Sequence, residues 1–298
     1  MSRRGTLLFA AMCVIWGVPY LMIRVAVREL APVTLVCLRT AIAALILLPV
    51  AAARGELRPL ARRWAAVVVF SAIEIGVPWL LLARAETKLT SSLTGLLVAA
   101  VPLVGAVVTA ATGARERHGA RRWLGLVVGL AGVAALVGLD LHGAAVVPLV
   151  ELAVVAVGYA VGPIILARRL ADAPPTGVVA ASLTVAAIAY APFAAFSLPP
   201  ALPEASVVWS VFGLAVLCTA VAFLLFFALI AEVGPVRATV ITYVNPAVAA
   251  VLGVSVLGES FTGGMAVGFV LVLAGSVLAT APSREAAGRS ARGLPESA

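Results

Sequence analysis

Apolar residues occur along this chain in long runs, and short polar segments separate the runs. Ten runs are each about 20 residues long, the length that an α-helix needs to cross the roughly 30 Å hydrocarbon core of a bilayer. The first five predict helices at residues 5–27, 33–53, 64–83, 90–113 and 122–140. The other five predict helices at residues 146–167, 175–197, 206–230, 238–258 and 263–281. We therefore expect an all-α polytopic membrane protein with ten transmembrane helices.

The second half of the chain repeats the pattern of the first. Pro246 follows Pro102 by 144 positions, and the apolar segments around the two prolines align at this offset. The repeat predicts two five-helix units, at residues 1–141 and 142–281, and a disordered cytoplasmic tail at residues 282–298. Because each unit has an odd number of helices, the second unit enters the membrane from the opposite side. We expect two inverted-topology repeats.

The composition agrees with a membrane protein. The chain is 63% hydrophobic and has a mean hydropathy of +1.15, well above what a water-soluble globular protein shows. The net charge of +8 comes from basic residues scattered among short loops, so no nucleic-acid partner is expected. Cys13, Cys37 and Cys218 all lie within apolar runs, which indicates neither a disulfide nor a metal site. No cofactor is expected.

The basic residues predict the orientation of the helices. With the N-terminus inside the cell, sixteen of the 21 lysines and arginines fall in cytoplasmic segments. The outer segments hold only Arg24, Arg28, Arg84 and Lys88. Short loops rich in arginine stay on the cytoplasmic side. Both termini are therefore expected in the cytoplasm, and the many arginines and alanines are typical of a GC-rich bacterial genome.

Short motifs recur in a defined order along both halves. The first half contains Ile15-Trp16-Gly17, Ala31-Pro32, Leu38-Arg39 and Pro102, and the second contains Thr219-Ala220, Val233-Gly234-Pro235, Tyr243, Pro246 and Leu257-Gly258-Glu259. In this order and spacing the chain resembles the EamA-like drug/metabolite transporters over nearly its whole length. The first half departs from the family pattern at Ala114-Arg115-Glu116. The resemblance implies a ten-helix secondary transporter, but it does not indicate the cargo.

The fourth and ninth predicted helices each carry a stripe at helical spacing. The two stripes consist of Gly95, Ala99, Pro102 and Ala106, and of Thr239, Tyr243, Pro246 and Ala250. A proline within a helix leaves a backbone carbonyl without its usual donor, and neighbouring helices or cavity water must satisfy it. Pro102 and Pro246 are therefore predicted as paired hinge or cavity positions in the substrate site. The alternative is a packed kink without ligand contact.

Polar and aromatic residues extend this predicted substrate site. Thr239, Tyr243 and Asn245 place hydroxyl and amide groups near Pro246, where a polar solute would need partners. Trp16 and Tyr20 lie one turn apart on the first helix. We predict that Trp16, Tyr243 and Asn245 line one central cavity. For Trp16 and Tyr20, the alternative is a place in the aromatic belt of the membrane interface.

Three ionisable residues, Arg39, Glu74 and Glu151, lie inside predicted helices and away from their ends. Glu74 stands about 15 Å from either interface and is predicted both to bind substrate and to couple transport to protons. Its alternatives are a permanently protonated carboxyl between helices and a pair with Arg39. Glu151 is the second candidate for proton coupling, although it could also reach water at the membrane surface. Arg39 could pair with an acid, line a cavity or bond to backbone carbonyls.

These features together favour a secondary active transporter in the bacterial cytoplasmic membrane. It would export a small organic metabolite, such as an amino acid, a related compound or a drug-like solute, by alternating access. The sequence has no P-loop, and His118 and His142 fall in loops. A lipid flippase, a passive channel and an intramembrane enzyme remain alternatives. Small-residue faces in the fifth and tenth helices favour packing within one chain, with a homodimer as the alternative; they comprise Gly125, Gly129, Gly132, Gly264, Gly268 and Gly275.

Overall fold

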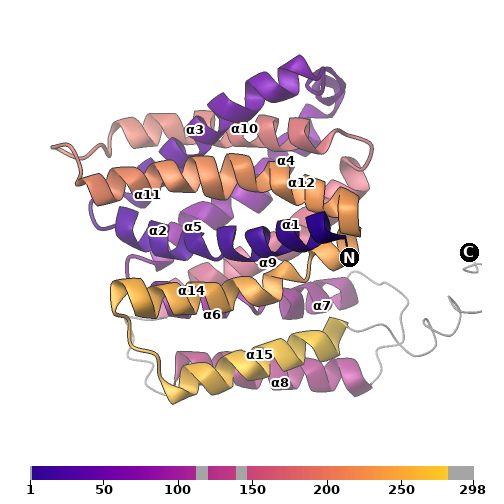
Figure 1. Cartoon of the computed structure of the whole chain (residues 1–298), viewed down its shortest axis with the longest axis vertical. Coiled ribbons are helices and arrows are strands. Elements are labelled where there is room, and N and C mark those ends of the chain that lie inside the picture. Colours follow the sequence, from indigo (N-terminus) through magenta and orange to yellow (C-terminus); the bar gives the residue numbers. More distant parts are fainter. Residues whose placement is uncertain (1, 112–119, 139–145, 281–298) are drawn as a thin grey trace, which may run out of the picture.

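The computed structural model describes residues 2–111, 120–138 and 146–280, and within these ranges it contains helices and no strand. The elements before residue 139 are α1 (Arg3–Ile15), α2 (Val18–Ala26), α3 (Pro32–Ala53), η1 (Arg58–Arg63), α4 (Trp64–Phe70), η2 (Ser71–Gly76), α5 (Val77–Ala85), α6 (Ser91–Val98), α7 (Val101–Ala111) and α8 (Ala120–Val137). Those after residue 145 are α9 (Val146–Arg169), α10 (Pro175–Ala195), α11 (Ala205–Ala215), η4 (Val216–Val221), α12 (Ala222–Val233), α13 (Pro235–Ala238), α14 (Ile241–Leu257) and α15 (Gly263–Thr280). The long helices lie side by side in one bundle (Figure 1).

Eight helical segments in the described ranges are long and apolar enough to cross a membrane. They correspond to the predicted runs apart from 122–140 and 238–258. The run at 238–258 forms the shorter apolar helix α14, and the run at 122–140 forms α8. The ends of three predicted helices, at 112–113, 139–140 and 281, and the predicted tail at 282–298 lie outside the described residues.

Several of the spanning segments are interrupted partway. The first segment breaks into α1 and α2 at Trp16-Gly17, and the fourth breaks into α6 and α7 at Ala99-Ala100. Prolines stand at the second position of α2 and α7, where a residue without an N–H fits the start of a helix. The segments that contain η2 and η4 instead widen into one π-helical turn each. Such turns are common at functional sites of helical proteins.

Glycines bring α8 and α15 into close contact within the one chain. A Cβ atom on Gly132 would lie 2.6 Å from the backbone nitrogen of Val272, and one on Gly268 would lie 2.8 Å from the carbonyl oxygen of Gly132. One on Gly125 would lie 2.5 Å from the nitrogen of Ala279. The small-residue faces thus allow the two backbones to touch, as expected for packing within one chain.

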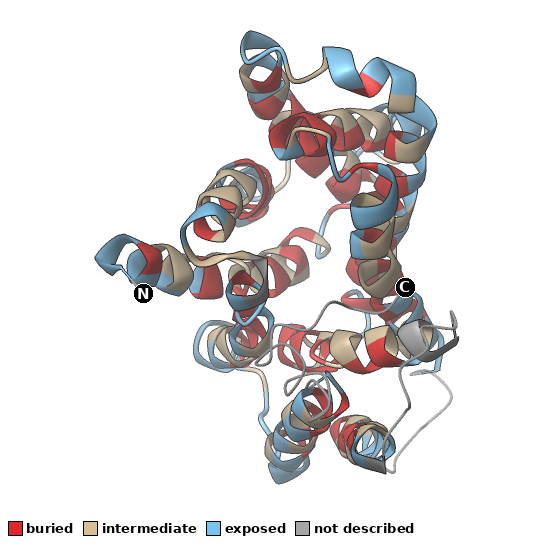
Figure 2. Ribbon diagram, turned by 90° about the vertical axis from the view of Figure 1, so that its right-hand side faces the viewer, coloured by how far each residue is buried: buried red, intermediate tan, exposed pale blue. Residues whose placement is uncertain are grey.

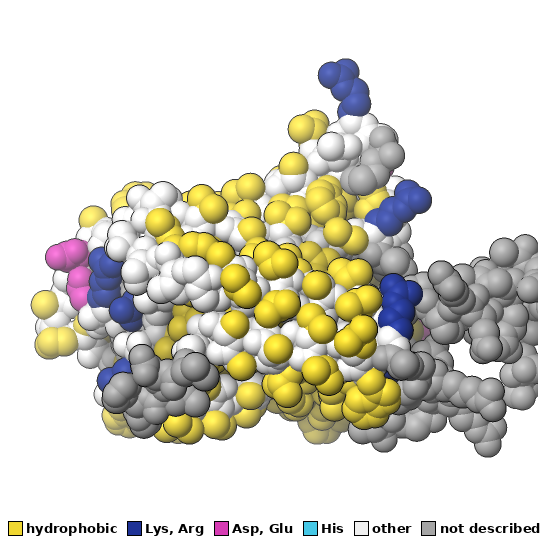
Figure 3. Space-filling view, turned by 90° about the horizontal axis from the view of Figure 1, so that it is seen from below, with side chains coloured by type: hydrophobic (Ala, Val, Ile, Leu, Met, Phe, Trp, Pro, Cys, Tyr) yellow, Lys and Arg dark blue, Asp and Glu magenta, His cyan; other side chains and the backbone are white. Residues whose placement is uncertain are grey.

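The outer surface of the bundle is apolar between two charged ends. Figure 3 shows hydrophobic side chains covering the middle of one face, with charged side chains toward either end. Large apolar residues such as Leu7, Leu45 and Leu130 are exposed on the surface of the bundle. Seen from the end, buried residues concentrate where helices face one another (Figure 2). An apolar belt of this kind fits hydrocarbon rather than water, so the protein is a multi-pass membrane protein.

Candidate functional site

The interior of this apolar bundle holds an arginine. Arg39 lies on α3 and is only 6% exposed. Its Nε donates a hydrogen bond to the hydroxyl of Thr219 on η4 at 3.0 Å. The centre of its guanidinium lies 3.7 Å from the centroid of the Trp79 ring on α5. Thr219 in turn donates to the carbonyl of Leu214 at 2.7 Å, so the widened turn of η4 fixes the position of its hydroxyl.

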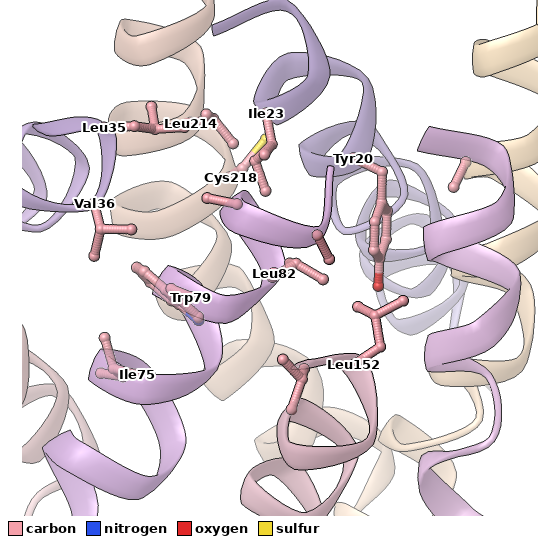
Figure 4. Packing of buried hydrophobic residues seen from close by; sticks show 14 of the residues in the cluster. Tyr20, Ile23, Leu35, Val36, Ile75, Trp79, Leu82, Leu152, Leu214 and Cys218 are labelled. Atoms are coloured by element: carbon pink, nitrogen blue, oxygen red, sulfur yellow. The ribbon is translucent and has the colours of Figure 1, made fainter. Parts of the chain in front are cut away.

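Two tyrosines lie near this arginine, and one of them also lies near Glu74. Tyr20 on α2 and Tyr159 on α9 both lie within electrostatic range of Arg39, and Tyr159 also lies within range of Glu74. Tyr20 and Trp79 are buried in the largest hydrophobic cluster of the bundle, where Figure 4 shows both rings among apolar neighbours. We call Tyr20, Arg39, Glu74, Trp79, Tyr159 and Thr219 the interior polar cluster. It joins the first, second, third, sixth and eighth spanning segments.

Glu74 lies on the π-helical turn η2, against α9. Its Oε2 is buried and has no hydrogen-bond partner among the described residues. A Cβ atom on Gly162 would collide with this oxygen, and one on Gly158 would lie 2.6 Å from the carbonyl oxygen of Ile73. The two glycines therefore let α9 approach η2 closely. The hydroxyl of Tyr190 donates to the carbonyl of Gly76 at 3.1 Å and satisfies one acceptor of the irregular turn.

A different acidic pair lies at the end of the bundle opposite the N-terminus. Glu259 accepts hydrogen bonds from the backbone N–H groups of Ser91 and Ser92, both at 2.8 Å, and from their hydroxyls at 3.0 and 2.5 Å. It therefore caps the N-terminus of α6, where a negative charge is favourable. Burial opposes its ionisation, but the bonds from Ser92 and Ser91 outweigh burial and lower the pKa of Glu259.

Glu86 lies near this cap and follows α5 directly. The side chain is fully buried, and neither carboxyl oxygen has a hydrogen-bond partner in the part of the chain that the structure describes. Arg24 donates to its backbone carbonyl rather than to its carboxyl. Burial, followed by the nearby charge of Glu259, raises the pKa of Glu86 well above its ordinary value. Glu86 and Glu259 therefore have pKa values shifted in opposite directions, upward for Glu86 and downward for Glu259.

Replacing Glu259 with glutamine is expected to destabilise the protein by about 1–3 kcal/mol at pH 7, because hydrogen bonds to an ionised group are lost. A lowered pKa means that this stabilisation is present above the ordinary pKa of 4.5 and disappears as the pH falls through the folded-state value. The melting temperatures of wild type and Glu259→Gln should converge below pH 4.5. Glu204→Gln, at an exposed loop position, is the matched control. An equal gap at pH 7 and pH 4 would contradict the proposed cap.

Of the residues that the sequence predicts for the substrate site, only Tyr20 and Glu74 belong to the interior polar cluster. Trp16 packs instead against Phe223 and Phe226, with ring centroids 5.9 and 4.7 Å apart. The Asn245 amide, oriented to satisfy its surroundings, donates to the carbonyls of Ile241 at 2.9 Å and Cys13 at 3.1 Å. Trp16 and Asn245 thus lie in a second group between α1, α12 and α14.

The other predicted positions are spread along the fourth and ninth segments. Pro102 is half-buried at the start of α7, and Pro246 is buried within α14. Tyr243 is half-buried, and Thr239 is exposed just before α14 begins. Glu151 forms an ion pair with the half-exposed Arg84. The Nε of Arg84 lies 2.7 Å from the Oε1 of Glu151.

Sequence reasoning did not select Trp79, Tyr159 or Thr219 for the site. Thr219 belongs to one of the family motifs, which was an available signal. Trp79 and Tyr159 carry no motif and are two aromatic residues among many. For Arg39, two of the alternatives from the sequence were an ion pair and bonds to backbone carbonyls. Among the described residues, the structure shows neither a carboxylate within ion-pair distance of Arg39 nor a backbone carbonyl bonded to it.

A bundle of spanning helices with polar and ionisable side chains in its interior is the architecture of a membrane transporter. The model of the EamA-like transporter family matches residues 3–138 and 149–281, and the chain therefore belongs to this family. It is a transporter embedded in a lipid bilayer.

The chain is also similar to individual proteins. It is 29% identical over 264 residues to a protein called uncharacterized inner membrane transporter YedA from Escherichia coli K12, covering 85% of this chain and 82% of the relative. The YedA proteins of Escherichia coli O6:H1 and O157:H7 match equally. A solved crystal structure with 23% identity superimposes with a TM-score of 0.66 over 95% of this chain and 98% of its own, which supports the fold.

Proposed function

We propose that this protein is a secondary active transporter that exports a small organic metabolite across the bacterial inner membrane by alternating access. The observation that carries the proposal is the interior polar cluster, in which Arg39 on α3 is held by Trp79 and Thr219 from two other helices. Charged and polar side chains are costly within a bilayer and mark solute pathways when they face the interior of a bundle. The name of the YedA relatives, inner membrane transporters, supports the location.

We further propose ten helices arranged as two inverted halves, residues 1–141 and 142–281. The packing supports this symmetry. The second segment packs along the seventh (α3 and α10), the fourth along the ninth (α6 and α14), and the fifth along the tenth (α8 and α15). The third packs on the sixth (α5 and α9), and the eighth packs on the first (α11 and α12 on α2 and α1). A two-fold axis in the membrane plane would produce these pairs, and it would also relate η2 in the third segment to η4 in the eighth.

The interrupted helices provide the proposed points of movement. The breaks at Trp16-Gly17 and Ala99-Ala100 and the π-turns η2 and η4 lack the regular hydrogen-bond ladder that stiffens a helix. Pro102 and Pro246 lie close to such irregular positions and are our candidates for hinges. Rotation of one half against the other at these points would open the interior polar cluster to alternate sides of the membrane.

Glu74 is the proposed proton carrier. A charge at its depth costs at least about 2.5 kcal/mol, and protonation removes that cost. Its Oε2 has no partner in the described structure, so no ion pair opposes the loss or gain of a proton. Glu151 is the second candidate, but its ion pair with Arg84 would have to break in each cycle. The substrate contacts predicted for Trp16, Tyr20, Thr239, Tyr243 and Asn245 remain proposals.

Reconstitution of the full chain into proteoliposomes tests the proposed function. A comparison of metabolites in cells with and without the protein selects the solutes to be assayed. We expect saturable flux of one such solute that accumulates against its gradient when a pH gradient is imposed. Flux that only equilibrates the solute would indicate a channel. Movement of a fluorescent phospholipid between leaflets without solute flux would indicate a flippase.

The proposed topology predicts which loops reach the outside of the cell. Leu202, in the loop before α11, is 96% exposed, and Arg58, in the loop before α4, is also exposed. A cysteine at Leu202 should react with a membrane-impermeant thiol reagent added to intact cells, and a cysteine at Arg58 should react only after the cells are opened. The unsubstituted chain controls for its own three cysteines. The opposite labelling pattern would refute the orientation.

A further inference from the structure

No carboxylate among the described residues lies within ion-pair distance of Arg39. The ion pairs in the described part of the protein join Arg54 to Glu56, Arg63 to Asp172 and Arg84 to Glu151. A guanidinium carries five N–H donors, and the single hydrogen bond that Arg39 makes to a described residue uses Nε. A buried charge without a partner is strongly unfavourable. The site therefore favours an anion that comes from outside the protein.

The residues around Arg39 do not supply that anion. Those within electrostatic range are Cys218 on η4, Tyr159 on α9, Tyr20 on α2 and Glu86 after α5. A thiol and two phenols are ordinarily neutral at physiological pH. Glu86 forms no ion pair with Arg39, and burial raises the pKa of its carboxyl, which disfavours the charged form. No neighbour among the described residues thus pairs with the positive charge of Arg39.

The guanidinium is also held in a fixed orientation. Its plane is supported by the Trp79 ring at 3.7 Å, and its Nε is directed to the Thr219 hydroxyl at 3.0 Å. Neither contact uses Nη1 or Nη2. These two nitrogens form an edge that can bind a carboxylate through two parallel hydrogen bonds. Lysine could not reproduce this fork. Trp79 and Tyr20, which lie near Arg39, belong to the main hydrophobic cluster.

We propose that Arg39, oriented by Trp79 and Thr219, binds the carboxylate of the transported solute and selects for small carboxylic acids with an apolar body. This inference rests on the proposed transport function and names the substrate class of the same site. The carboxylate supplies the counter-charge that Arg39 lacks. The apolar body of the solute contacts the hydrophobic wall, and a neutral or cationic analogue would leave the arginine buried without compensation.

Ligand-dependent thermal stability of the full chain in lipid nanodiscs tests this proposal. The probes are benzoate, its neutral analogue benzamide, the cation benzylammonium, and chloride at equal ionic strength. We expect benzoate to raise the melting temperature in a saturable manner, and the other three to have little effect. Equal stabilisation by benzamide, or stabilisation by none of the probes, would overturn the proposal. An equal effect of chloride would reveal an inorganic anion site instead and would also overturn it.

Variants assign the effect to Arg39. Arg39→Gln should weaken benzoate binding about tenfold or more, as expected when a charged hydrogen-bond donor is lost. Arg84→Gln, which removes an arginine already paired with Glu151, should bind benzoate like the wild type. If Arg39→Gln does not fold, Arg39→Lys retains the charge without the fork and should still bind benzoate more weakly. Unchanged benzoate affinity in the Arg39 variants would contradict the assignment.

The outcome can be separated from that of the proposed function. A chain that accumulates a neutral or cationic solute under a pH gradient, with flux unchanged in Arg39→Lys, would remain a secondary transporter but would refute the carboxylate site. A chain that binds benzoate through Arg39 but moves no solute would retain the site and refute transport.

Discussion

Glu74→Gln is expected to abolish solute accumulation driven by a pH gradient while leaving exchange of the solute without a gradient intact. Glutamine has nearly the shape of protonated glutamate, so it should preserve the packing of η2 against Gly162. It cannot release a proton, however, and the step that links solute movement to the gradient is lost. Gradient-driven flux in proteoliposomes should fall to the level of passive equilibration.

Two further variants sharpen this experiment. Glu204→Gln removes an exposed carboxyl from a loop and should transport like the wild type. Glu151→Gln tests the second candidate by breaking the ion pair with Arg84. Full pH-driven accumulation by Glu74→Gln would show that this carboxyl does not couple transport to protons. Loss of accumulation in Glu151→Gln alone would move the coupling site to that residue.

Gly132→Ala is expected to destabilise the protein by about 1–3 kcal/mol, although alanine normally favours a helix over glycine. The added Cβ would lie 2.6 Å from the nitrogen of Val272 and 2.8 Å from the carbonyl oxygen of Gly268. Both atoms belong to the backbone of α15 and cannot rotate away. The two helices must separate, and close contacts along the whole interface weaken with them. Thermal unfolding of the purified protein measures the effect.

Gly263→Ala, on the partner helix α15, is the matched control. A Cβ atom there meets nothing within 4 Å, so its melting temperature should stay close to that of the wild type. The same experiment addresses the alternative that these glycines form a homodimer interface. If the glycines formed a homodimer interface, Gly132→Ala would lower the apparent mass of the purified protein from that of a dimer. The unfolding of the single chain would then stay unchanged.

Local pattern alone predicted most of the helical architecture. Runs of apolar residues near 20 in length mark spanning helices because the bilayer thickness sets that length and every backbone group must be bonded within the helix. The same reasoning singled out Glu74, since a carboxyl in the middle of an apolar run has no nearby water. The glycines of α8 and α15 were also visible as recurring small residues. Each of these features depends on spacing within one helix.

The partners of the interior residues could not be predicted from any such spacing. Thr219 stands 180 positions from Arg39, and the serines capped by Glu259 stand 167 and 168 positions before it. The sequence predicts that Trp16 and Asn245 line one cavity with Tyr243, but not their own partners. The packing of α1 on α12 and α14 turns Trp16 to two phenylalanines and Asn245 to two carbonyls. Periodicity determines which face of a helix is apolar or polar. Only the packing of whole helices decides which polar faces meet, because contacts between distant segments depend on the shapes of all the side chains between them.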